Sequence, residues 1–292
     1  MYFQVSGVEV NPFVPPLVAF MISFFTSMGG VSGAFLLLPY QFSVLGYTAP
    51  SVSATNLFFN VVGTPGGILR YVRERQMLWP LALSLIIGTL PGVFLGAWAR
   101  IELLPDPRNF KFFAGFILCY LGLRLLIDAR RNEITRVKNS VRGVGQVQHS
   151  IGRISFEFGS EHFHFSAYGV VAMSLLVGFL GGVYGIGGGA LIAPVLIVFL
   201  RLPVQIVAGP ALLSTFATSA VGVLFYQILA SSYEGTSVAP DYRLGLLFGL
   251  GGLVGMYLGG GCQKHVSSRA IKLILCVCVL FVGSKYIWDF WR

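Results

Sequence analysis

The chain has 292 residues, of which 55% are hydrophobic and only 11% charged, and its formal net charge is +9. A soluble domain carries about 25% charged residues, so this composition excludes a protein that faces water over its whole surface. The basic excess lies in loops between apolar runs, which argues against a nucleic-acid-binding protein. We therefore expect a polytopic α-helical membrane protein whose partners are the lipid bilayer and a small substrate.

The first apolar run, residues 13–45, contains a glycine-rich break at Ser27–Gly33, and the run at 166–200 contains a second break at Gly182–Gly188. One constant spacing pairs Gly30 with Gly185, Gly33 with Gly188 and Pro39 with Pro194. Two copies of a broken hydrophobic element are typical of secondary transporters, which bind substrate between such breaks near the middle of the bilayer.

Three apolar runs follow each break, and each is long enough to cross a bilayer, which needs roughly 20 residues. They lie at 50–71, 78–99, 109–127, 204–229, 244–262 and 270–290. Another constant spacing pairs Gly88, Gly92 and Gly96 with Gly251, Gly255 and Gly259. The pattern predicts two homologous transmembrane repeats, 1–129 and 166–292. Each would hold a Gly-broken helix or re-entrant hairpin followed by three transmembrane helices.

The direction of the two halves depends on the broken runs. If each run crosses the membrane once, the halves are parallel; if each is a hairpin, they are inverted. Arg70, Arg73 and Arg75, together with the basic linker 130–165, mark cytoplasmic loops by the positive-inside rule. Inversion adds further basic residues to that side, and the N-terminal segment has none, so the sequence favours inversion. The oligomeric state stays open.

The linker 130–165 is the main segment expected outside the membrane. Its second part alternates apolar and polar residues in 154–158 and again in 162–165, around a Gly-containing turn, which predicts a small β-hairpin. The phenylalanines would share one face of this hairpin. His162 and His164 share the other face, and without a third ligand they indicate a solvated strand rather than a metal site.

The helix that resumes after each break is the first candidate for substrate binding. Its N-terminus presents free backbone N–H groups with a partial positive charge, which suits an anion, and glycine lets a ligand approach the backbone. The candidates are Gly29, Gly30, Ser32 and Gly33 in the first half and Gly185, Gly187, Gly188 and Gly189 in the second. The alternative is close helix packing through small residues.

A polar stripe on the next helix of each half is the second candidate. Spacings of three and four residues place its members on one side of a helix. They are Asn56, Asn60 and Thr64 in the first half and Ser214, Thr215, Thr218 and Ser219 in the second. Such residues line a water-filled path or form hydrogen bonds between helices.

Catalytic, metal and cofactor chemistry find little support in the sequence. No Asp or Glu lies near the middle of a predicted span, so a proton relay built on carboxylates is not indicated. The spans hold no pairing of a nucleophile with a base, so we do not expect an enzyme. The cysteines are spaced as packing residues; they are Cys119, Cys262, Cys276 and Cys278.

These features together resemble the TauE/SafE sulfite exporter family (TSUP) of bacterial membrane permeases. The resemblance covers about residues 15–290 and rests on both breaks, on Thr55-Asn56-Leu57 and Ala208-Gly209, and on the glycines of 88–96 and 251–259. It implies a multi-pass protein of the bacterial inner membrane that exports sulfite or an organosulfonate such as sulfoacetate. Asn56 and Asn60 depart from the family's small or hydroxyl residues. A carrier for another small anion or a metal ion, and a non-transporting membrane scaffold, remain alternatives.

Overall fold

The computed structural model describes residues 1–28, 31–75, 77–130, 147–150, 152–158, 161–200, 202, 204–233, 235–262 and 268–291. The first half contains strands β1 (Tyr2–Phe3) and β2 (Val8–Glu9) and helices α1 (Val14–Met28), α2 (Ala34–Ser43), α3 (Ser51–Arg73), α4 (Trp79–Glu102) and α5 (Pro107–Arg130). Strands β3 (Val147–Ser150), β4 (Arg153–Phe158) and β5 (Glu161–Ser166) follow. The second half contains α6 (Ala167–Tyr184), α7 (Gly188–Phe199), α8 (Val204–Ala230), α9 (Tyr242–Cys262) and α10 (Ser268–Phe290).

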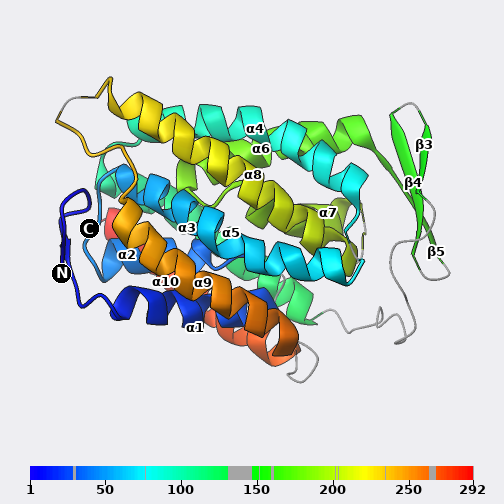
Figure 1. Ribbon diagram of the computed structural model, residues 1–292, viewed down its shortest axis with the longest axis horizontal. Coiled ribbons are helices and arrows are strands. Elements are labelled where there is room, and N and C mark those ends of the chain that lie inside the picture. The colour runs from blue at the N-terminus through cyan, green and yellow to red at the C-terminus, as the bar shows by residue number, and fades with distance from the viewer. Residues whose placement is uncertain are drawn as a thin grey trace.

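The expected all-α membrane architecture is confirmed. Among the described residues, five helices are long and apolar enough to cross a membrane, namely α4, α5, α6, α8 and α9. Each predicted span coincides with one helix to within a few residues at either end. Helix α3 also has a spanning length of 23 residues, but its Asn, Ser and Thr residues lower its hydropathy. It lies in the middle of the bundle (Figure 1), where neighbouring helices cover these polar groups.

The molecule has two distinct ends (Figure 1). At the terminal end, which holds both chain termini, the Ser6 hydroxyl donates to Asp241 over 2.8 Å and Ser51 N–H donates to the Ser237 carbonyl over 3.0 Å. The sheet end holds strands β3–β5 and the last turn of α3. We keep these two names below.

The two broken runs form hairpins rather than crossings. Helix α1 begins at the terminal end and α2 ends there, because the Ser43 hydroxyl hydrogen-bonds Tyr286 near the end of α10. Helix α6 begins at the sheet end directly after β5, and α7 ends there, just before α8 begins. Helices of 15 and 10 residues measure about 22 and 15 Å. Neither α1 nor α2 can therefore cross a hydrocarbon core of about 30 Å by itself.

Glycines set the packing of the hairpins against the long helices. Along α4, Cβ atoms at Gly88, Gly92 and Gly96 would fall onto the backbone of α6. Along α9, the same holds for Gly251, Gly255 and Gly259 against α1. In each pair the contacts advance in the same direction, so α4 runs parallel to α6 and α9 runs parallel to α1. Helices α3 and α8 pack antiparallel at the centre, and Cys119 of α5 packs against Gly283 of α10.

The linker contains a three-stranded antiparallel sheet in the order β3-β4-β5. Strands β4 and β5 occupy the segments expected to form a hairpin, and β3 is a further strand that the pattern did not predict. Phe156 pairs with Phe163, with ring centroids 5.5 Å apart, while His164 is exposed on the opposite face. The basic segment 131–146 and the expected turn at 159–160 lie outside the described residues.

Candidate functional site

The second break is a short irregular segment that only glycine adopts easily. Gly185 ends α6 in the left-handed conformation with φ of 80°, and Gly187 precedes α7 with φ of 71° and ψ of 161°. Residues with a Cβ rarely adopt a positive φ, so these two positions require glycine. The chain thereby breaks the helix inside the bundle and starts α7 at Gly188.

The first break ends with Val31, Ser32 and Gly33, and α2 begins at Ala34. Val31 N–H donates to the Thr26 carbonyl over 3.2 Å, and the Ser32 side chain is buried. Gly33 lies against α1, where an added Cβ would be 2.7 Å from Ser23 Oγ. Gly29 and Gly30 lie outside the described residues.

Two amides of α3 join the breaks. Asn56 Nδ2 donates to the Ala34 carbonyl over 3.0 Å and to the Gly185 carbonyl over 2.9 Å, so one nitrogen binds both breaks. Asn60 Nδ2 donates to the Ile186 carbonyl over 3.0 Å. Irregular backbone inside a membrane must be hydrogen-bonded by the protein or line a cavity. The NH2 groups of Asn56 and Asn60 meet that need.

Most threonines of the polar stripes bind their own helix. Thr64 donates to the Asn60 carbonyl over 2.7 Å, Thr215 to the Ala211 carbonyl over 2.9 Å and Thr218 to the Ser214 carbonyl over 2.6 Å. The Thr218 oxygen also accepts from Gly188 N–H over 3.3 Å, at the start of α7. The Ser214 hydroxyl lies 3.1 Å from that of Thr89 in α4.

Three buried serine hydroxyls near the breaks have no partner among the described residues: Ser23, Ser32 and Ser219. Ser23 faces Gly33, as described above, and a Cβ at Gly187 would be 2.8 Å from Ser219 Oγ. Each half therefore places one unpartnered hydroxyl beside a break glycine. The acceptor Asn60 Oδ1 is buried and unpartnered as well.

The break glycines of the second half also pack closely. A Cβ at Gly185 would meet Ser53, one at Gly188 would meet Thr89, and one at Gly189 would meet the Ala211 carbonyl and Thr215. The α-carbons of these glycines therefore face neighbouring helices.

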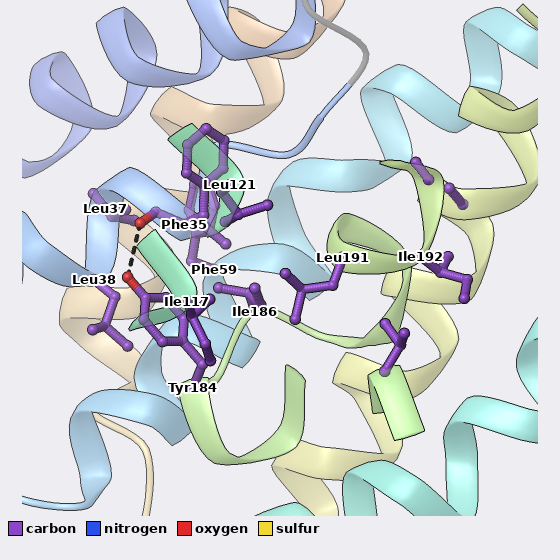
Figure 2. Close-up of a cluster of buried hydrophobic side chains, with 14 of the residues drawn as sticks. Phe35, Leu37, Leu38, Phe59, Ile117, Leu121, Tyr184, Ile186, Leu191 and Ile192 are labelled. Carbon is purple, nitrogen blue, oxygen red and sulfur yellow. Dashed lines mark hydrogen bonds between the residues drawn. The ribbon is translucent and has the colours of Figure 1, made fainter. Parts of the chain in front are cut away.

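An apolar cluster surrounds this region, and Figure 2 shows its side chains. Tyr184, at the end of α6, donates its hydroxyl to the Phe35 carbonyl of α2 over 3.1 Å. Phe59 and Ile186 lie beside this hydrogen bond in the same view. Such surroundings exclude water and strengthen electrostatic interactions with a bound ion.

The sequence analysis found the breaks and the stripes but missed two polar residues. Ser23 lies in the apolar run of α1 and has no hydroxyl counterpart in the second half, so no repeat marks it. Arg100 lies in the last turn of α4 and is 0% exposed, although its position beyond the apolar run suggested a loop. Among the described residues, no group of three His, Cys, Asp or Glu side chains could hold a metal ion.

The matches to known proteins all point to one family of membrane transporters. The model of the family described as "Sulfite exporter TauE/SafE" matches residues 16–286. The chain is 21% identical over 271 residues to the probable membrane transporter protein YunE of Bacillus subtilis, covering 90% of this chain and 92% of YunE. It is 24% identical over 275 residues to a probable membrane transporter protein of Xylella fastidiosa, covering 93% of each. No solved structure matches the chain.

Proposed function

The chain belongs to the TauE/SafE sulfite exporter family of membrane transporters, and from this premise we propose that it exports a small oxyanion across the bacterial inner membrane. The substrate class is sulfite or an organosulfonate such as sulfoacetate. The observation that carries the proposal is the pair of unpartnered hydroxyls beside the breaks, Ser23 next to Gly33 and Ser219 next to Gly187. Hydroxyls and helix N-termini donate hydrogen bonds, which oxygen-rich anions accept.

The substrate would lie between the breaks, with Ser32 and the N–H groups at the start of α2 on one side. Ser219 would face it from the other half, together with the N–H groups that follow Gly188 at the start of α7, since Gly188 N–H already binds Thr218. Asn56 and Asn60 support this site rather than supply its NH2 donors, because those donors already bind Ala34, Gly185 and Ile186. The free Asn60 Oδ1 suits a water or a protonated oxygen of the substrate.

We infer further that residues 1–129 and 166–292 are an inverted repeat joined by the linker 130–165. Reciprocal contacts support this: Leu57 packs on Gly222 while its counterpart Leu212 packs on Gly67. The glycines of α4 contact α6, and those of α9 contact α1 at the counterpart positions. The contacted residues are Val171, Leu175 and Phe179 in α6 and Pro16, Phe20 and Phe24 in α1. The α1–α2 hairpin enters the bundle from the terminal end and the α6–α7 hairpin enters from the sheet end, as an inverted repeat requires.

The basic residues support a cytoplasmic sheet end. Arg70, Arg73 and Arg75 lie there at the end of α3, and the basic linker connects to the same end. The positive-inside rule assigns such loops to the cytoplasm. Export then runs from the sheet end to the terminal end.

Membrane voltage can drive this export without a coupled ion. An anion leaving a negative cytoplasm gains about 2.3 kcal/mol per charge per 100 mV. The described breaks and stripes carry no carboxylate that would serve as a proton carrier.

The test is transport by the purified protein in liposomes loaded with radiolabelled sulfite or sulfoacetate. A potassium gradient with valinomycin sets the voltage, and we expect efflux to follow it. Ser23→Ala and Ser219→Ala should each weaken apparent affinity about threefold to tenfold, since a net hydrogen bond contributes about 1 kcal/mol. Ser84→Ala is the matched control, because the Ser84 hydroxyl donates to the Pro80 carbonyl of its own helix over 2.9 Å.

Three results would contradict the proposal. Liposomes that move no anion would favour a non-transporting scaffold. Efflux that ignores voltage and follows a proton gradient would refute the voltage-driven mechanism. If Ser23→Ala and Ser219→Ala transport as well as Ser84→Ala does, the two hydroxyls do not belong to the substrate site.

A further inference from the structure

Arg100 is a fully buried cation close to the terminal end. Its Nη1 donates to the Leu104 carbonyl, and its guanidinium carbon lies 3.9 Å from the centroid of the Phe110 ring. Its Nε and Nη2 atoms are buried and have no hydrogen-bond partner in the part of the chain that the structure describes. These two nitrogens form one edge of the guanidinium group, the edge that binds two oxygens of an oxyanion side by side.

A second unpaired donor lies close to this edge. Tyr226 of α8 is 0% exposed, and its hydroxyl lies near Ser53 of α3 but makes no hydrogen bond of regular geometry with any described residue. Tyr226 packs in one cluster with Ala97 and Ile101 of α4, on either side of Arg100 in the sequence, and is near enough to Arg100 to interact with it electrostatically. Two helices that are distant in sequence, α4 and α8, thus bring a free guanidinium edge and a buried phenol hydroxyl into the same part of the bundle.

The position of this pair relates it to the second break. Gly96, one helical turn before Arg100, packs against Gly182 and Val183 at the end of α6. Ser53 of α3 donates to the Val183 carbonyl over 3.3 Å and packs against Gly185. Arg100 therefore lies between the second break and the terminal end.

The protein supplies Arg100 with no counter-charge among the described residues. The nearby Glu102 binds the Tyr233 hydroxyl and thereby raises the pKa of that phenol, and the Asp106 carboxylate accepts from Arg108 N–H. Asp241 accepts hydrogen bonds from Ser6 and Leu244. The partial negative charge at the C-terminal end of α4 attracts the Arg100 guanidinium and accounts for its hydrogen bond to the Leu104 carbonyl. This attraction does not explain why the Nε–Nη2 edge is buried without a partner. A buried charge without a counter-charge is strongly unfavourable in a membrane protein.

We propose that Arg100 and Tyr226 form a second anion-binding site on the exit side of the breaks. The free guanidinium edge binds two oxygens of the transported oxyanion, and the Tyr226 hydroxyl donates to an oxygen of the same ion. This site rests on the proposed function, since it receives the anion that leaves the breaks. It also identifies the substrate class as one with at least two adjacent oxygens, such as sulfite, a sulfonate or a carboxylate.

The experiment measures equilibrium binding of radiolabelled sulfite to the purified protein in detergent, by dialysis at low chloride. We expect Tyr226→Phe to weaken binding about threefold to tenfold and Arg100→Lys at least tenfold, because lysine keeps the charge but lacks the planar edge. Arg100→Gln should remove binding at this site and leave binding at the breaks, so the amount of sulfite bound per protein at saturation should fall. Arg108→Gln is the matched control, since Arg108 is exposed at the same end and binds the Phe290 carbonyl; it should bind like wild type.

Thermal unfolding separates binding from folding. A purely structural Arg100 would lower the unfolding temperature of Arg100→Lys and leave the sulfite dissociation constant unchanged, which would overturn the inference. If Arg100→Gln does not fold, Tyr226→Phe and Arg100→Lys carry the test. Wild-type transport with unchanged affinity in these two variants overturns this inference alone. A wild-type protein that neither binds nor transports anions overturns the proposed function with it.

Discussion

At the scale of single residues, the breaks depend on side-chain amides that bind backbone carbonyls. Asn56 is the central case, because its Nδ2 bridges Ala34, the first residue of α2 after the first break, and Gly185 of the second break. Its Oδ1 in turn accepts from Gln41 over 3.3 Å. The amide therefore couples the positions of the two breaks, and a shift of one would disturb the other.

Asn56→Asp should destabilise the protein by about 1–3 kcal/mol, since two buried carbonyls lose their donor and face a carboxylate. We expect a lower unfolding temperature and loss of transport, measured by tryptophan fluorescence in detergent and by efflux from liposomes. Asn11→Asp is the control, because Asn11 is exposed and only accepts, from Phe13 N–H, which aspartate does equally well. Equal unfolding temperatures for the two variants would show that Asn56 does not hold the breaks together.

At the scale of elements, helix packing rests on glycines that bring backbones into contact. Helix α9 meets α1 through Gly251, Gly255 and Gly259, and α4 meets α6 in the same manner. Small residues at such faces let helices approach closely enough for van der Waals contact to hold them together without a hydrophobic driving force. Helices α1, α2 and α7 are too short to span a bilayer alone, so these contacts help to keep the breaks in place.

Two alanine substitutions in α9 should have opposite effects. A Cβ at Gly259 would fall onto the Phe24 carbonyl and Ser27 Oγ, so Gly259→Ala must separate α9 from α1 and cost about 1–3 kcal/mol. A Cβ at Gly261 would meet only Arg70 Nη1, at 3.2 Å, the far end of a flexible side chain. Gly261→Ala should be neutral or stabilise by up to about 1 kcal/mol through helix propensity. Unfolding temperatures that fall equally in both variants would refute the close packing of α1 on α9.

At the scale of the whole molecule, the two ends differ in charge. Arg70, Arg73 and Arg75 lie together at the sheet end, whereas at the terminal end Arg108 lies among the acidic residues Glu102, Asp106 and Asp241. By the positive-inside rule, Arg70, Arg73 and Arg75 support the proposed orientation, with the sheet end in the cytoplasm. In that orientation the proposed Arg100 site lies on the outer half of the export path.

Single cysteines test this orientation in a variant that lacks the native cysteines. Ser155 of β4 is exposed at the sheet end, and Ser232 is exposed between α8 and α9 at the terminal end. In intact spheroplasts, a membrane-impermeant maleimide should label Ser232→Cys at once, and Ser155→Cys only after the membrane is permeabilised. The reverse pattern would place the basic linker outside and invert the proposed direction of export.

Much of the architecture can be predicted from the sequence because it depends on local properties. Hydropathy and run length placed the transmembrane helices, and repeated glycines marked the breaks, since a positive φ such as that of Gly185 requires glycine wherever it occurs. Alternation predicted strands β4 and β5. Spacing also selected Asn56, Asn60 and Ser219, because residues three and four apart share a helix face.

Only the tertiary structure decided which of these polar groups are free. Asn56 and Ser219 look alike in a polar stripe, yet Asn56 binds two carbonyls from other segments, whereas the Ser219 hydroxyl has no partner among the described residues. Arg100 reads as a loop residue until α5 and α8 enclose it, and Ser23 acquires a role only because Gly33 folds back against α1. A hydrogen-bond partner or a covering helix comes from anywhere in the chain. The burial of a polar group and the presence of a hydrogen-bond partner are therefore properties of the packed bundle. Hydropathy and backbone freedom, in contrast, belong to each segment alone.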